Sequence, residues 1–150
     1  MEAVIGTLQT DFEGVTRNGK TLTFSGMNLQ VVSGSGTTDG KINGLGNIII
    51  GYNERRQDGT DNTTGSHNLI IGTMNDYQSY ASAIVRSWNT ASGKYSSAFG
   101  VGNMASGPGS SVSGGYNNTA GGESSSVSGG TSRQTTGQYN WAGGSYSSPN

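Results

Sequence analysis

Aromatic side chains are the residues of this chain best suited to contact a ligand. Trp88 and Tyr116 are predicted to share one row of a repeat, two coils apart, and Tyr77, Tyr80 and Tyr95 lie nearby along the chain. The faces of aromatic rings stack on sugar rings and anchor protein interfaces. We therefore predict that these five residues are candidates for ligand binding. The structural alternative, which the residue pattern favours, is that the rings cover corners of the fold or a seam between chains.

Groups that could perform acid, base or metal chemistry are sparse. His67 is the single histidine, and its neighbours Ser66 and Asn68 are typical of a turn in which the ring bonds to backbone. The chain has no cysteine, which excludes a disulfide framework or a thiolate metal site. The aspartates form neither a calcium-binding loop nor the paired carboxylates of a glycoside hydrolase. We predict a protein that is not an enzyme, with no catalytic residue, no metal ligand and no cofactor.

Composition and charge restrict the partners. Only 11% of the residues are charged and the net charge is −1, so the chain lacks the dense basic surface that phosphate backbones require. No run of about 18 apolar residues that could span a bilayer is present, and the first residues do not form an export signal. We therefore expect no nucleic-acid partner and no membrane insertion by this segment.

Apolar residues recur at a fixed spacing, which is the mark of a repeat protein. The series advances by about 14 residues per step. One step, between Val112 and Val127, is longer by a single position, and Ile49 joins the series after a polar insertion at residues 54–64. The predicted core row reads Ile49, Ile70, Ile84, Ala98, Val112, Val127 and Trp141. Further rows with the same step consist of asparagine (Asn75, Asn89, Asn103, Asn117) and of serine (Ser82, Ser96, Ser110, Ser125).

This short period determines the fold class. It is too short for a pair of helices, but it accommodates two strands of about five residues and two tight turns. Each coil would stack on the next at about 4.8 Å, with the asparagines hydrogen-bonded from coil to coil as a ladder. We therefore predict an all-β fold, a parallel β-roll or β-solenoid with coils of about 14 residues.

A second apolar row runs beside the core row. It contains Ile50, Ile71, Val85 and Phe99 and continues with serine at positions 113 and 128. Adjacent strand positions face opposite sides, so this row needs a cover that the coil itself does not provide. The simplest cover is a symmetry mate, and a thin coil has little interior of its own. We predict that these four residues form the contact of a homo-oligomer, as a three-fold or a two-fold bundle.

The chain is expected to contain two regions. Residues 1–43 would form an N-terminal cap or adaptor, with short strands at Lys20–Phe24 and Asn28–Val32. Residues 44–150 would form the repeats, interrupted by the loop at 54–64, whose Arg55 and Arg56 are either solvated or bind an acidic partner. The last residues, 145–150, end without a clear cap, which indicates a piece of a longer protein.

The repeat resembles the head domain of trimeric autotransporter adhesins. The segment SSAFGVGNMASG at 96–107 is similar to the family's repeat, which reads approximately N-S-V-A-I-G-x-x-S-x-A-S-G, and HNLIIG at 67–72 is similar to its core. Related repeats resemble modules of phage or injection-machine tail fibres. The resemblance covers roughly residues 44–144 and implies a left-handed parallel β-roll that trimerises, as part of a larger fibre or stalk assembly. Serine at 113 and 128, where the family places apolar residues, departs from its pattern.

These residues bear on four functions. The first is a trimeric fibre head at a cell surface or on a tail fibre, extracellular, that binds a host-surface glycan or protein. The alternative is a purely structural spacer or tip of a tail fibre or secreted filament. An ice-binding solenoid would need a regular ladder of threonines, which Thr90, Thr119 and Thr135 do not form. A polysaccharide lyase or hydrolase would need paired carboxylates in a cleft.

Overall fold

The computed structural model describes residues 12–144, and the expectations for residues 1–11 and 145–150 lie outside this range. The chain divides into two compact units, residues 1–30 and residues 31–150. The boundary therefore falls earlier than the expected position after residue 43. Residues 31–43 belong to the same unit as the repeats, and one reason is His67, whose ring bonds to Ser33.

The described part of the first unit contains a β-hairpin. β1 (Val15–Asn18) pairs antiparallel with β2 (Thr21–Phe24), with Val15 opposite Phe24 and Asn18 opposite Thr21. Gly19 occupies the first position of the two-residue loop with a φ of 57°, as type II′ hairpin turns require. The strand predicted at residues 28–32 is wrong, because β2 pairs with the segment before it rather than the segment after it.

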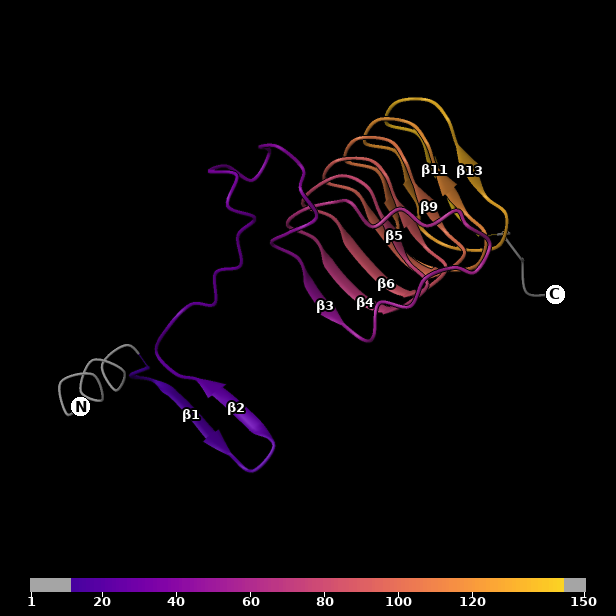
Figure 1. Ribbon diagram of the computed structural model, residues 1–150. Coiled ribbons are helices and arrows are strands. Elements are labelled where there is room, and N and C mark those ends of the chain that lie inside the picture. The colour runs from indigo at the N-terminus through magenta and orange to yellow at the C-terminus, as the bar shows by residue number, and fades with distance from the viewer. Residues whose placement is uncertain (1–11, 145–150) are drawn as a thin grey trace, which may run out of the picture. The chain divides into compact units, whose positions relative to one another are not determined.

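The second unit is built from short strands with turns between them (Figure 1). The strands are β3 (Ile48–Ile50), β4 (Leu69–Thr73), β5 (Asp76–Tyr77), β6 (Ala83–Ser87), β7 (Thr90–Ala91), β8 (Ser97–Val101), β9 (Met104–Ala105), β10 (Ser111–Val112), β11 (Thr119–Ala120), β12 (Ser126–Val127), β13 (Gln134–Thr135) and β14 (Trp141–Ala142). Within residues 12–144 there is no helix, and hence none long and apolar enough to cross a membrane.

Successive strands alternate between two parallel sheets. Within the described residues, β14-β12-β10-β8-β6-β4-β3 form a seven-stranded sheet and β13-β11-β9-β7-β5 form a five-stranded sheet. Figure 1 shows the two layers facing each other, with β4 and β6 in one and β9, β11 and β13 in the other. Every neighbouring pair in both sheets is parallel, and Ile70, Ile84 and Ala98 pair in register from coil to coil. The predicted all-β parallel solenoid and its coil length are therefore confirmed.

Each strand of the solenoid contributes one inward-pointing side chain to the interior. Ile70, Ile84, Ala98, Val112 and Val127 are at most 1% exposed and point inward from the first sheet. The opposite wall was not predicted from the sequence and consists of Tyr77, Ala91, Ala105, Ala120 and Thr135, all buried. Alanine dominates this wall because so short a coil leaves room for few atoms between its two strands.

Two members of the predicted core row are not buried. Ile49 pairs in register with Ile70, as predicted, but it is 39% exposed because it belongs to β3, the edge strand of its sheet. Trp141 is 69% exposed and pairs with Ser126, while Ala142 pairs with Val127. The last coil is therefore one position longer than the first coils, so alanine takes the inward position and the placement of Trp141 in the core row is wrong. An indole would not fit the narrow interior.

Asparagine side chains connect the coils at one corner. The Oδ1 atoms of Asn75, Asn89 and Asn103 accept the backbone N–H of the asparagine in the following coil, at 3.0, 3.0 and 2.8 Å. The fourth member of this ladder is Asn118, which is fully buried, and not Asn117, which is exposed. The ladder satisfies backbone groups that a tight corner would otherwise leave without partners.

Candidate ligand-binding site

Two of the predicted aromatic residues line one cleft on the solenoid. The cleft has a volume of about 400 Å³ and is lined by Trp88, Val101, Gly102 and Tyr116. Trp88 is 43% exposed and Tyr116 is 56% exposed, so both rings are accessible to solvent. A cleft of this size with apolar walls is within the range of small-molecule binding sites.

The corner of each coil positions the cleft. Trp88 directly follows β6 and has a φ of 59°, and Gly102 has a φ of 65° at the same corner one coil later. The equivalent residues of the other coils are Met74, Asn117 and Ser132, all with positive φ. Tyr116 precedes this row by one position and forms a bridge with Val101. The prediction that Trp88 and Tyr116 share one row is therefore wrong, because the extra residue of the longer coil shifts Tyr116 by one place.

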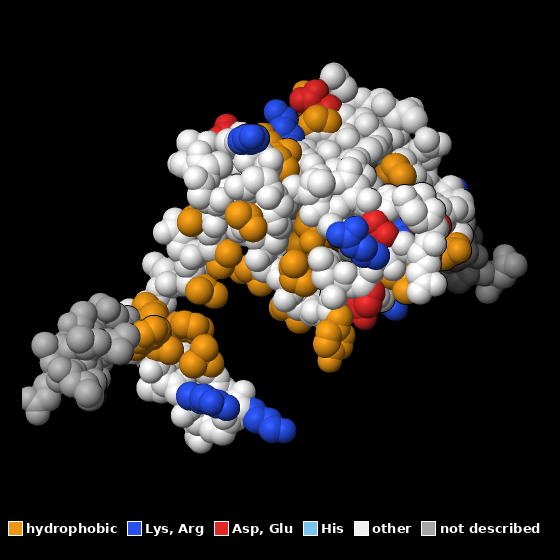
Figure 2. Space-filling view, in the orientation of Figure 1, with side chains coloured by type: hydrophobic (Ala, Val, Ile, Leu, Met, Phe, Trp, Pro, Cys, Tyr) orange, Lys and Arg blue, Asp and Glu red, His pale blue; other side chains and the backbone are white. Residues whose placement is uncertain are grey.

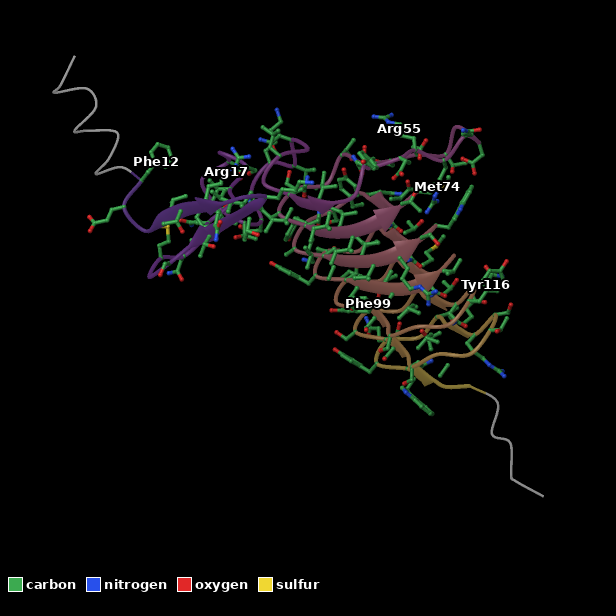
Figure 3. The ribbon with its side chains drawn as sticks, turned by 90° about the horizontal axis from the view of Figure 1, so that it is seen from below. Phe12, Arg17, Arg55, Met74, Phe99 and Tyr116 are labelled. Carbon is green, nitrogen blue, oxygen red and sulfur yellow. The ribbon has the colours of Figure 1, made fainter. Side chains whose placement is uncertain are left out.

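Gly102 creates the hollow between the two rings. It stands in the coil between Trp88 and Tyr116 and has no side chain to fill the space. A Cβ atom added to Gly102 would meet only the backbone nitrogen of Asn117, at 3.9 Å. Figure 3 shows the labelled Met74 and Tyr116 along the same flank of the solenoid, which is the flank that carries the cleft.

Arg56 supports Trp88 from the insertion loop. Its guanidinium carbon lies 5.7 Å from the centroid of the Trp88 ring, within the range of a cation–π contact. Arg56 Nη1 forms an ion pair with Asp76 Oδ2 at 2.9 Å, and the side chains are only 11% and 3% exposed. Nε donates to Met74 O, and Nη2 donates to Asn89 O and Thr90 Oγ1. Arg56 is thus neither solvated nor available to an acidic partner, in contrast to both readings of the loop from sequence, whereas Arg55 is exposed.

Burial controls the ionisation of Asp76. Desolvation raises the pKa of this carboxyl above its ordinary value of 3.8, and the Asp61 and Asp58 carboxylates act in the same direction. The backbone N–H of Asn62, which donates to Oδ1 at 3.1 Å, and the Arg56 guanidinium oppose the rise. Removing a carboxylate from water is costly even when it has a partner, so the pKa stays raised.

The other predicted aromatic residues lie away from this cleft or inside the fold. Tyr80 and Tyr95 form an edge-to-face pair with ring centroids 5.2 Å apart, and the hydrogen bond between them raises the pKa of Tyr80. Tyr77 is 3% exposed and packs in the core, with its hydroxyl accepting a hydrogen bond from Asn53 Nδ2. The Tyr77 ring is therefore not accessible to a ligand.

His67 connects two segments of the chain. The backbone N–H of Ser33 donates to Nε2 at 2.9 Å, and Nδ1 lies 3.2 Å from the carbonyl oxygen of Thr38. These contacts correspond to a neutral ring with its proton on Nδ1. His67 itself has a φ of 56°, so it occupies a turn and holds residues 33–38 against the first coils.

The predicted oligomer contact lies on the outer face of the seven-stranded sheet. Ile50, Ile71, Val85 and Phe99 pair in register on β3, β4, β6 and β8. Ile50 is 56% exposed and the other three are half-buried. Two further apolar residues of this face, Ile48 and Leu69, are 41% and 38% exposed. Figure 2 shows hydrophobic side chains over the region of β3 and β4 on a surface that is otherwise mostly uncharged.

The cleft and the outer face of the seven-stranded sheet can recognise a ligand or partner by shape and through uncharged groups. Among residues 12–144, no three His, Cys, Asp or Glu side chains gather in a group that could hold a metal ion. The cleft supplies aromatic walls and the outer face supplies aliphatic surface.

Comparison of the chain with protein-family models, with curated proteins and with solved structures finds no match.

Proposed function

We propose that this chain is the head of a homotrimeric extracellular fibre, that it is not an enzyme, and that it attaches the fibre to a receptor on another surface. The resemblance of its repeats to the heads of trimeric autotransporter adhesins supports this proposal and implies a left-handed roll. The same resemblance extends to tail-fibre modules, so the parent fibre belongs to a cell surface or to a tail.

The observation that carries the proposal is the apolar strip on the outer face of the sheet, formed by Ile50, Ile71, Val85 and Phe99. Four apolar side chains from four consecutive strands form a continuous surface, and a soluble protein rarely leaves such a surface uncovered. The narrow interior of each coil buries little apolar surface, so it does not offset the cost of leaving this strip in water. The strip ends after Phe99, where Ser113 and Ser128 continue the row, so the contact between copies would be confined to the first half of the solenoid.

Light scattering coupled to size exclusion tests the assembly. We expect a trimer for the wild type and a monomer for Val85→Asp, because three copies of the charge would meet at the seam without a partner. Met104→Asp is the matched control, since Met104 is 42% exposed on the five-stranded sheet and not on the strip. Circular dichroism verifies that each variant is folded. A wild type that is folded and monomeric would overturn the proposal.

A purely structural spacer would form the same trimer but bind nothing. Glycan arrays and attachment assays with whole cells separate the two functions. We expect the trimer to attach to cells in a saturable manner. A trimer that binds neither cells nor any glycan or protein of such a panel would leave the spacer as the function.

A further inference from the structure

We infer that the cleft between Trp88 and Tyr116 binds a neutral pyranose ring of an oligosaccharide. This inference rests on the proposed function, because it names the receptor chemistry of an attachment head. It begins from the fact that two solvent-exposed aromatic rings line one cleft of about 400 Å³. Aromatic faces carry negative charge density, so they attract the positively polarised C–H groups on one face of a sugar ring.

The spacing of the coils admits one ring between the two aromatic side chains. Trp88 and Tyr116 belong to coils that are separated by the coil of Val101 and Gly102. Two coil spacings amount to about 9.6 Å, and a ring packed between two others needs about 3.5–4.0 Å on each side. Gly102 keeps this space open, since a side chain at its position would project into the cleft.

The charges around the cleft favour a neutral ligand. The four lining residues are uncharged. Arg56, the cation beside Trp88, is already engaged by Asp76, by two carbonyl oxygens and by Thr90. Asn117 and Ser132 occupy the same corner in the next two coils, and both are exposed. Their amide and hydroxyl groups are suited to hydrogen bonds with sugar hydroxyls.

Trp88 is fixed before any ligand arrives. Its backbone is held at a φ of 59° by the hydrogen bond from its N–H to Thr73 O, and Arg56 packs against its ring. A side chain that is already ordered loses little entropy on binding, which increases affinity. Arg56 is therefore a positioning residue for Trp88 and does not contact the sugar.

An array of neutral oligosaccharides ending in hexoses or N-acetylhexosamines, with sialylated and sulfated glycans beside them, tests the inference. The best neutral glycan is then titrated while Trp88 fluorescence is followed in a Trp141→Phe background, which leaves Trp88 as the only tryptophan. We expect a saturable change in emission. Trp88→Ala lacks this fluorophore, so its affinity is measured by isothermal titration calorimetry beside that of the wild type, and it should bind about tenfold or more weakly.

Gly102→Asn is the most specific variant. Asparagine tolerates positive φ and already occupies the equivalent corner at Asn117, so this change should fill the cleft without unfolding the chain. Gly109→Asn is the matched control, because Gly109 has the same φ of 65° at the opposite corner. We expect Gly102→Asn to lose at least about tenfold in affinity and Gly109→Asn to bind as the wild type does.

Several results would overturn the inference. These are an array without any neutral ligand, binding of charged glycans alone, and unchanged binding by both Trp88→Ala and Gly102→Asn. The proposed function is tested separately by the oligomeric state and by attachment to cells. A trimer that attaches to cells equally well with and without Trp88 would remove the sugar site and leave the attachment head intact.

Discussion

Arg56 and Asp76 form a buried ion pair, with Nη1 and Oδ2 2.9 Å apart, between an insertion loop and the first strand of the five-stranded sheet. The same guanidinium lies over the ring of Trp88. One arginine thus joins the loop, the coil corner and the candidate binding cleft. The insertion at residues 54–64 is part of the solenoid rather than an excursion from it.

The ion pair should be important for stability. We expect Arg56→Gln to lower the free energy of unfolding by about 3 kcal/mol, because it leaves the buried Asp76 carboxylate without its cation. Chemical denaturation followed by circular dichroism measures this change. Arg55→Gln is the matched control, since Arg55 is exposed one position earlier, and it should change stability by less than about 0.5 kcal/mol. Equal effects of the two variants would contradict the role of Arg56.

Asp76 should make stability depend on pH in a specific direction. Its pKa is raised in the folded chain by burial, so folding binds its proton more tightly than the unfolded chain does. The stability that Asp76 contributes is then fully present below its ordinary pKa of 3.8 and is lost as the pH rises through the folded pKa. We expect the unfolding free energy of the wild type, minus that of Asp76→Asn, to fall as the pH rises from about 3 to 7.

Denaturation curves of both proteins at each pH provide this difference. Since Asn cannot titrate, other ionisable groups cancel to first order in the subtraction. A difference that rises with pH would mean that the Arg56 guanidinium outweighs desolvation at Asp76, and it would contradict the expectation.

The buried asparagines of the ladder should contribute more to the free energy of unfolding than the exposed Asn117 beside them. Asn103 is 1% exposed, and its Oδ1 accepts the N–H of Asn118 at 2.8 Å. Asn103→Ala leaves that buried N–H without a partner, so we expect a loss of about 2 kcal/mol in unfolding free energy. Asn117→Ser is the control, because Asn117 is exposed and serine occupies the equivalent position at Ser132. If the two variants denature together, the ladder is not the source of stability.

The periodicity of apolar residues was sufficient to predict the solenoid, its coil length and most of one wall of its interior. It failed where a coil gains a residue among glycine, serine and asparagine, as between Val112 and Asn118, because such residues do not mark the position of the insertion. For this reason the spacing points to Asn117 instead of Asn118 for the ladder, and to Trp141 instead of Ala142 for the core row. The buried position of Arg56 had no local signal, since its partner Asp76 lies beyond the next strand of the chain, β4.

Arg86 occupies a backbone position that suits glycine. It has a φ of 86°, whereas its in-register neighbours are Gly72, with a φ of 114°, and Gly100, with a φ of 106°. A side chain at positive φ costs about 1–2 kcal/mol, and glycine gives back part of this through its greater freedom in the unfolded chain. We therefore expect Arg86→Gly to raise the unfolding free energy by about 0.5–1 kcal/mol. Arg86→Lys is the control, because it keeps both the charge and the strain, and it should denature at the same denaturant concentration as the wild type. A stabilised Lys variant or a destabilised Gly variant would show that the side chain, and not the backbone, determines stability at this corner.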